Sequence, residues 1–242
     1  LAQAHLLLIG CAVLVAILVG LPISLWAAQD RRARSLLLGA IGLMQTIPGL
    51  ALLALFYPLL LLIGQSTGLP IPALGFLPAL LALSIYALLP IVRNGVAAIT
   101  GIDPALVEAA KGLGMTRRQR VFHVELPLGA PVILAGIRTA AVWTIGTATL
   151  ATTIGQPSLG DLIFSGLQTE NWRRVLIGCL AAALLAILVD GLLALLESGL
   201  ATLPIALSRR GISMSMSIIP ARSGPMCSAA RIPHLPKPCS RL

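Results

Sequence analysis

Long runs of apolar residues alternate with short polar segments along this chain, and they set the expected secondary structure. Five runs come close to or exceed the roughly 20 residues that a helix needs to cross the hydrocarbon core of a membrane. They lie at about 5–28, 36–63, 74–92, 128–154 and 175–196. The pattern predicts an all-α membrane protein with about five transmembrane helices.

Two prolines, Pro48 and Pro58, interrupt the second run. Proline removes a backbone donor and crowds the preceding turn, so we expect the helix to kink or break there. A broken helix at membrane depth normally lines a cavity or is buried in protein. Gln45 and Thr46 directly precede the first proline. We therefore expect Gln45, Thr46 and Pro48 to mark a translocation pathway.

The composition supports a membrane protein over a large soluble helical core. Mean hydropathy is +0.97 and charged residues make up 10% of the chain, whereas soluble domains carry about 25%. Too little polar surface remains to cover a soluble core. The four cysteines show no C-x-x-C spacing, so we expect small buried side chains and incidental thiols, and no metal site.

The cations between the runs predict the orientation of the chain. Cytoplasmic loops of membrane proteins carry an excess of Lys and Arg. The loop after the second run has none, and the loop after the fourth has two beside Glu170. The cations that follow the first, third and fifth runs are Arg31, Arg32, Arg34, Arg93, Lys111, Arg117, Arg118, Arg120, Arg209 and Arg210. This alternation places those loops in the cytoplasm and the N-terminus outside.

A polar segment at 103–127 separates the third and fourth runs and holds seven charged side chains. Asp103 followed by Pro104 is a helix start, because Asp caps the first N–H groups and proline suits the first helical position. We expect a helix over 104–113. Gly114 can end it in the left-handed conformation.

A second, basic helix is expected after this turn. Thr116 and Gln119 have the spacing of a capping box, the arginines that follow suit the cytoplasmic headgroup level, and Pro127 marks the entry to the fourth run. The first helix carries small residues at 108–110, which suits docking into a groove of a partner. The alternative is an ordinary capped loop at the membrane surface.

The spacing of this segment resembles the EAA loop of ABC-importer permeases. The matching positions are Glu108, Ala109, Ala110, Gly114, Val124, Leu126 and Pro127, with Val124 where isoleucine is commoner. In that family the loop is a coupling helix that docks into a cytoplasmic ATP-binding subunit. The resemblance implies the binding-protein-dependent permease fold, and it implies that Glu108, Ala109, Ala110, Gly114, Leu126 and Pro127 couple the chain to an ATPase.

Three further stretches look like the osmoprotectant branch of these permeases, which takes up glycine betaine, carnitine or choline. They begin QTIPGLALLAL at Gln45, YALLPIVRNGVAAITGIDPALVEAAKGLG at Tyr86 and LPLGAPVILAGIRTAAVWTIGTATLATTIG at Leu126. The resemblance covers about 6–197. Within it, IGQPSLGDLI departs from the small-residue pattern IGAGGLGDLI that we expect of the branch.

The resemblance implies a permease without covalent chemistry or a cofactor of its own. No G-x-x-x-x-G-K-[ST] motif occurs, so the ATPase must be another chain. The expected partners are two cytoplasmic ATP-binding subunits, an extracytoplasmic substrate-binding protein, a second permease copy or paralogue, and the lipid of a bacterial plasma (inner) membrane. No nucleic-acid partner is expected. The chain has few aromatic residues to cage a quaternary ammonium, which favours selectivity in the binding protein.

Two alternatives remain open from the residues. One is an amino-acid or sulfonate permease, since the coupling loop is shared within the class. The other is an ATP-independent channel or membrane scaffold.

Polar residues inside the runs have local explanations. Arg138 can snorkel or pair with an acid, and Asp190 and Glu197 are expected to contact headgroups or a neighbouring loop. The six threonines of the fourth run are expected to bond mostly to their own backbone. Residues 158–168 predict an amphipathic helix at the outer interface, with Ser158 and Asp161 spaced as a capping box.

The end of the chain differs in composition from the rest. After about 211, prolines, serines and methionines gather without periodicity, and no acid follows Glu197. We expect a permease domain over 1–207 and a basic, disordered tail over 208–242. The absence of Met at Leu1, directly before a span, leads us to expect a truncated N-terminus.

Overall fold

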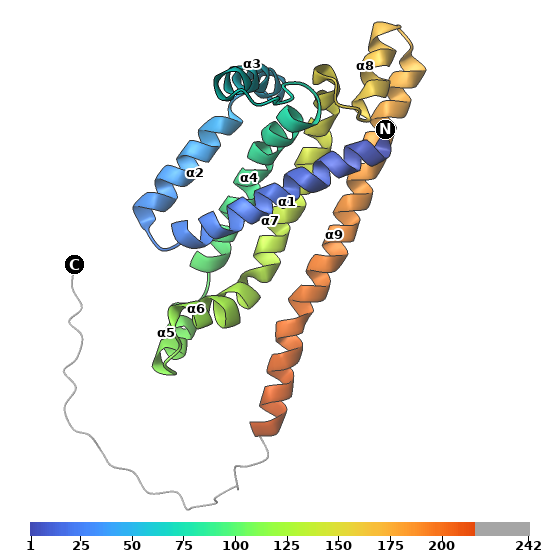
Figure 1. Cartoon of the computed structure of the whole chain (residues 1–242). Helices are drawn as coiled ribbons and strands as arrows, with labels where there is room; N and C mark the ends of the chain where they lie inside the picture. The colour runs from blue at the N-terminus through green and yellow to red at the C-terminus, as the bar shows by residue number, and fades with distance from the viewer. Residues whose placement is uncertain (216–242) are drawn as a thin grey trace, which may run out of the picture. The chain divides into compact units, whose positions relative to one another are not determined.

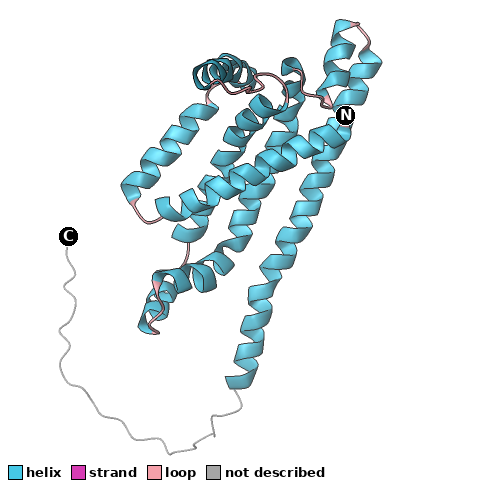
Figure 2. Cartoon of the chain, viewed as in Figure 1, coloured by secondary structure: helices cyan, strands magenta, loops and turns pink. Residues whose placement is uncertain are grey.

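The structure is a computed structural model that describes residues 1–215, with side chains described as far as Ser198. The end of the predicted tail, 216–242, lies outside the described residues. Every regular element in the described part is a helix (Figure 2). Five helical segments are long and apolar enough to cross a membrane, in agreement with the predicted number: Ala2–Ala27, Gly49–Thr67, Phe76–Thr100, Arg117–Ile154 and Trp172–Ser198.

Three helices form the packed centre of the compact unit Leu1–Ile205: α1 (Ala2–Ala27), α4 (Phe76–Thr100) and α7 (Leu126–Ala148) (Figure 1). Membrane helices associate through close packing of small residues rather than through a hydrophobic driving force. A Cβ built on Gly136 of α7 would lie 2.6 Å from the Cβ of Asn94 on α4. Glycine is therefore required at this crossing, because the two backbones approach too closely for any side chain.

The second apolar run is two helices, α2 (Arg31–Gln45) and α3 (Gly49–Thr67), which point in different directions (Figure 1). The expected break at Pro48 is confirmed. A break or kink was equally expected at Pro58, but α3 continues through it without ending. Losing one N–H does not end the helix here, where Pro58 is followed by four leucines at 59–62, which favour helix strongly. Of the two helices, α3 alone meets the length and hydropathy of a span.

The polar segment contains α5 (Pro104–Gly112) and α6 (Arg117–Arg120), followed by a π turn, η1 (Val121–Glu125), that leads into α7. The expected entry at Pro127 is therefore not a new start, since the helical path continues from α6 into α7. Pro127 has no N–H to donate to the carbonyl four residues back. The wider turn accommodates this loss, with the N–H of Leu126 donating to the Val121 carbonyl.

After α7 the chain tightens into a 3₁₀ segment, η2 (Thr149–Ile154), and then forms a hairpin of α8 (Gly160–Gln168) and α9 (Trp172–Ser215). Only one of the two bonds of the expected Ser158–Asp161 capping box forms before α8, and the residue that caps the helix is Leu159. The Ser158 N–H donates to Asp161 Oδ2 at 3.3 Å, and the Gly160 N–H donates to Ser158 Oγ at 3.0 Å. In Figure 1, α8 lies at the opposite end of α7 from α5 and α6.

Candidate functional site

The first half of the polar segment is a short helix with a specified start and stop. Asp103 accepts a hydrogen bond from the Ala105 N–H at 2.9 Å and starts α5. At the other end, the Met115 N–H donates to the Ala110 carbonyl at 3.2 Å and the Gly114 N–H to the Lys111 carbonyl at 2.9 Å. This pair of bonds is a Schellman motif, and the φ of Gly114 is +74°. The predicted left-handed turn is confirmed.

The structure separates the residues that the EAA resemblance groups together. Glu108, Ala109 and Gly114 are exposed, whereas Ala110 is buried. Leu126 and Pro127 lie at the start of α7, where Leu126 is half-buried and Pro127 exposed. Glu108 and Ala109 therefore belong to the free surface of α5, and Ala110 packs inward.

The second half of the segment is attached firmly to α7. The predicted capping box is present: the Thr116 N–H donates to Gln119 Oε1 at 2.9 Å and the Gln119 N–H to Thr116 Oγ1 at 3.4 Å. An ion pair that the sequence analysis missed joins Arg120 Nε to Glu125 Oε1 at 2.7 Å, with both side chains largely buried. Residues five apart share a face in a π turn, so this spacing is the signal that could have indicated the pair.

The break between α2 and α3 is held by α4. The Gln45 amide donates to the Tyr86 carbonyl at 2.9 Å, and the Tyr86 hydroxyl donates to the Ile47 carbonyl. Pro90 stands four residues after Tyr86 in the same helix and has no N–H to offer that carbonyl. Gln45 therefore supplies the donor that Pro90 cannot. Tyr86 was not among the predicted site residues, although its spacing from Pro90 indicates a carbonyl without a helical donor.

The three predicted pathway residues do not act alike. Gln45 is half-buried and bonded to α4, whereas Thr46 and Pro48 are exposed. The Thr46 hydroxyl donates to the Leu43 carbonyl at 2.7 Å, within its own helix. Tyr86 lies ten residues into α4, about 15 Å along the helix from Phe76. The break thus lies beside the middle of α4, a helix long and apolar enough to cross a membrane.

Charged side chains join α7 to α9. Arg138 Nε lies 2.5 Å from Asp190 Oδ1 and its Nη2 donates to Asp190 Oδ2 at 2.7 Å, while Nη1 lies 3.4 Å from Glu197 Oε2. The prediction that Arg138 pairs with an acid is confirmed. The expectation that Asp190 and Glu197 contact headgroups or a loop is wrong, because both acids pair with Arg138 of α7. Both acids project toward α7 because residues seven apart share a helix face.

Most threonine hydroxyls of the fourth run donate hydrogen bonds to nearby backbone carbonyls. Five of them donate to carbonyls three or four residues back: Thr139, Thr144, Thr147, Thr149 and Thr153. Thr152 differs, since its hydroxyl lies 2.6 Å from Ser158 Oγ and contributes to the structure before α8. Backbone bonding therefore explains the threonines, as predicted for most of them.

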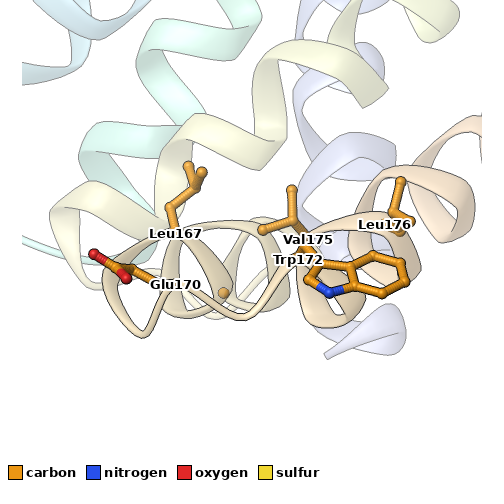
Figure 3. A pocket seen from close by; sticks show the side chains of 6 residues that line it. Leu167, Glu170, Trp172, Val175 and Leu176 are labelled. Atoms are coloured by element: carbon orange, nitrogen blue, oxygen red, sulfur yellow. The ribbon is translucent and has the colours of Figure 1, made fainter.

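The hairpin of α8 and α9 carries an apolar pocket of about 430 Å³. Figure 3 shows its side chains, with the Glu170 carboxylate and the Trp172 indole pointing away from each other. A Cβ on Gly178 would lie 2.7 Å from Ile163 Cγ1, so the helices are in close contact. Glu170 has a φ of +52°. The hairpin is a compact platform at the end of α7 away from α5.

Comparison with known proteins agrees with this arrangement. Residues 20–202 match the family described as "Binding-protein-dependent transport system inner membrane component". The chain is 39% identical over 193 residues to the choline transport system permease protein OpuBB of Bacillus subtilis (strain 168), covering 80% of this chain and 83% of that protein. It is 42% identical over 189 residues to the osmoprotectant import permease protein OsmW of Salmonella typhimurium, covering 78% and 85%.

Solved structures share the fold at lower identity. A permease chain from inward-facing conformations of the MetNI methionine ABC transporter superposes with a TM-score of 0.71 at 18% identity, covering 82% of this chain and 93% of that chain. An amino acid ABC transporter superposes with a TM-score of 0.60 at 22% identity, covering 81% and 91%. The chain therefore belongs to the inner membrane components of binding-protein-dependent transport systems: it is a non-enzymatic permease subunit of an ABC importer.

Proposed function

We propose that this permease takes up quaternary ammonium osmoprotectants such as glycine betaine. The observation that carries the proposal is the identity of 38–42% to permeases named for choline, carnitine and osmoprotectant import over about four fifths of the chain. The methionine and amino-acid transporters share 18–22% identity with it, which supports a common fold alone. Because the chain belongs to a family of ABC-importer permeases, we exclude the alternative of an ATP-independent channel or membrane scaffold.

The family works with ATP-binding subunits and a substrate-binding protein. In our proposal two ATP-binding subunits bind the α5 ends of two permease copies, or of one copy and a paralogue. The α5 end then faces the cytoplasm and the N-terminus faces outside, in the bacterial inner membrane. The binding protein docks on the hairpin of α8 and α9, whose close helix contact gives a rigid surface.

The geometry of the polar segment supports a coupling role. Glu108 and Ala109 are exposed on a helix with defined ends, so they can enter a groove of a partner. Gly114 sets the direction of that helix, and the bond between Arg120 and Glu125 fixes the segment to α7. A displacement of α5 by the ATPase is then passed to a helix of the central bundle, through Leu126 and Pro127 at its start.

We also propose that the break at Gln45, Thr46 and Pro48 lines the translocation pathway, and that 1–207 form the permease domain. The exposed Thr46 and Pro48 flank Ile47, whose carbonyl bonds to Tyr86 about halfway along α4. Irregular backbone at such depth is tolerated where it lines a cavity or is buried in protein. Truncation after Arg210 should leave uptake intact.

The substrate is tested by uptake. The complete transport system, expressed in a bacterium that lacks osmoprotectant importers, should accumulate radiolabelled glycine betaine at high osmolarity. Unlabelled carnitine or choline should compete, and methionine should not. Accumulation of methionine or a sulfonate, with none of glycine betaine, would refute the proposed substrate class.

The docking role of Glu108 is tested by co-purification of the ATP-binding subunit. Deleting one partner of a buried charge pair costs roughly 2–5 kcal/mol, so Glu108→Ala should weaken the complex by about tenfold or more. Glu108→Lys should weaken it further. An exposed loop carboxylate would change affinity by no more than about 0.5 kcal/mol. Glu170→Ala, at the far end of the molecule, is the matched control, and equal recovery of all variants would remove Glu108 from the interface.

A further inference from the structure

Two grooves meet on the exposed face of α7. One, of about 350 Å³, lies between α7 and α9, and the other, of about 380 Å³, lies between α4 and α7. Thr139 and Trp143 line both grooves. The two hollows therefore adjoin at these two side chains, and we call them together the α4–α7–α9 groove. Each part falls within the roughly 300–1,000 Å³ of known ligand sites.

Charged side chains line both parts of this groove: Arg138, Asp190 and Glu197 line one part, and Arg93 lines the other. Arg138 is held by both oxygens of Asp190, and its contact with Glu197 is a single long one at 3.4 Å. The charge of Arg138 is thus matched by Asp190, and Glu197 keeps most of its negative charge available. At the other end Arg93 is exposed, and no described acidic side chain lies within ion-pair distance of it.

The two parts of the groove share an aromatic ring, that of Trp143. The Trp143 side chain lines both parts of the groove and is 56% exposed. Tryptophan is the best of the aromatic residues for attracting a cation to its face, quaternary ammonium ions included. An arginine fork is suited to bind a carboxylate. The indole thus lines one hollow together with a guanidinium, Arg93, and the other together with a carboxylate, Glu197.

We propose that the α4–α7–α9 groove is a binding subsite for a zwitterion that carries a quaternary ammonium and a carboxylate. The ammonium lies over Trp143 beside Glu197, and the carboxylate points to Arg93. This inference rests on the proposed function and narrows it, since such a groove prefers a betaine over choline, which has no carboxylate. The pairing of Arg138 with Asp190 removes the objection that an arginine here would repel a cationic group.

Binding to the purified full-length permease tests the subsite directly. The protein is kept in a maltoside detergent free of choline lipids, and saturation-transfer NMR follows the methyl protons of glycine betaine. Trp143→Leu and Glu197→Gln should each raise the Kd for glycine betaine about fivefold or more, and Trp143→Phe should retain most of the binding. Trp26→Leu, which removes an equally exposed indole on α1, should leave the Kd unchanged.

Arg93→Gln tests the proposed carboxylate contact separately from the proposed ammonium contact. It should weaken binding of glycine betaine by about fivefold and leave choline binding unaltered, because choline offers no carboxylate to Arg93. Equal losses for both ligands, or no binding by the wild type, would overturn the subsite. A choline lipid headgroup shares the ammonium, so the titration is repeated with added phosphatidylcholine. Binding of the lipid alone, with no saturation transfer to free glycine betaine, would also overturn it.

Uptake by the complete system distinguishes this inference from the proposed function. If the wild-type importer takes up no quaternary ammonium compound, the proposed function fails. If it takes up glycine betaine while Trp143→Leu and Glu197→Gln bind and transport as the wild type does, the groove is not the subsite and the proposed function stands.

Discussion

The polar segment of α5 and α6 and the break between α2 and α3 satisfy their polar groups in opposite ways. In the segment, bonding partners lie within five residues: Asp103 with Ala105, Thr116 with Gln119, Arg120 with Glu125. At the break, Gln45 and Ile47 bond to a residue about 40 positions away, on α4. The first region keeps its shape by itself, and the second keeps its shape through the bundle.

This difference separates two kinds of mutational effect. A region whose bonds are internal can move as a unit, as a coupling element must, and damage to it should alter transport more than stability. A region bonded to a distant helix contributes to the stability of the bundle, because losing one partner leaves a polar group unsatisfied at membrane depth.

The largest effect is expected at Gly114. Gly114→Val should reduce uptake to about a tenth or less, because a β-branched residue resists the positive φ of this turn and α5 would change direction. Expression and thermal unfolding of the permease should remain close to wild type. Gly114→Asn, which tolerates the left-handed conformation, should retain transport. Normal uptake by the valine variant would show that the direction of α5 does not matter.

The next effect is on stability, at Gln45. Gln45→Met leaves the Tyr86 carbonyl without its donor and should lower the free energy of unfolding by about 1–3 kcal/mol. Adding Pro90→Ala restores a backbone N–H four residues after Tyr86, so the double variant should lose less than the single one. Unfolding in a mild detergent, followed for all four members of the cycle, measures the coupling. Strict additivity would contradict the assignment of Gln45 as a substitute donor.

A smaller loss is expected at Tyr86. Tyr86→Phe removes the hydroxyl that donates to the Ile47 carbonyl and keeps the ring, so the cost should be about 0.5–1.5 kcal/mol. The same unfolding measurement applies, with Tyr57→Phe as the matched control, because the Tyr57 side chain of α3 is exposed. A larger effect of the control than of Tyr86→Phe would show that the bond to the break adds no stability.

The smallest effect is expected at Glu170, which has a positive φ. Glu170 ends α8 with the same two bonds that Gly114 makes possible after α5, from Asn171 to Gly166 and from Glu170 to Leu167, yet it is not glycine. Glu170→Gly should therefore stabilise the permease by up to about 1 kcal/mol, because glycine adopts a positive φ without steric cost. A drop in the unfolding temperature would indicate that the glutamate side chain contributes a contact that outweighs the strain.

Much of the polar segment of α5 and α6 could be predicted from the sequence. Asp-Pro, the glycine turn and the Thr116–Gln119 spacing specify starts and stops through bonds between near neighbours, and α5, α6 and the φ of Gly114 follow them. The unpredicted part is the π turn at Val121–Glu125. A single proline without an N–H admits several local adjustments, and the packing of α7 selects among them.

What the sequence determined by itself is the set of helices, their caps and the family, because apolar runs and capping bonds depend on neighbours within one or two turns. Tertiary structure alone decided that Gln45 serves the carbonyl freed by Pro90, that Asp190 and Glu197 meet Arg138, and that Trp143 lines one hollow with Arg93 and another with Glu197. These partners are 40 to 100 positions apart in the chain. Helical periodicity fixes which face a residue occupies, but the packing of small residues at crossings such as Gly136 fixes which helix that face meets.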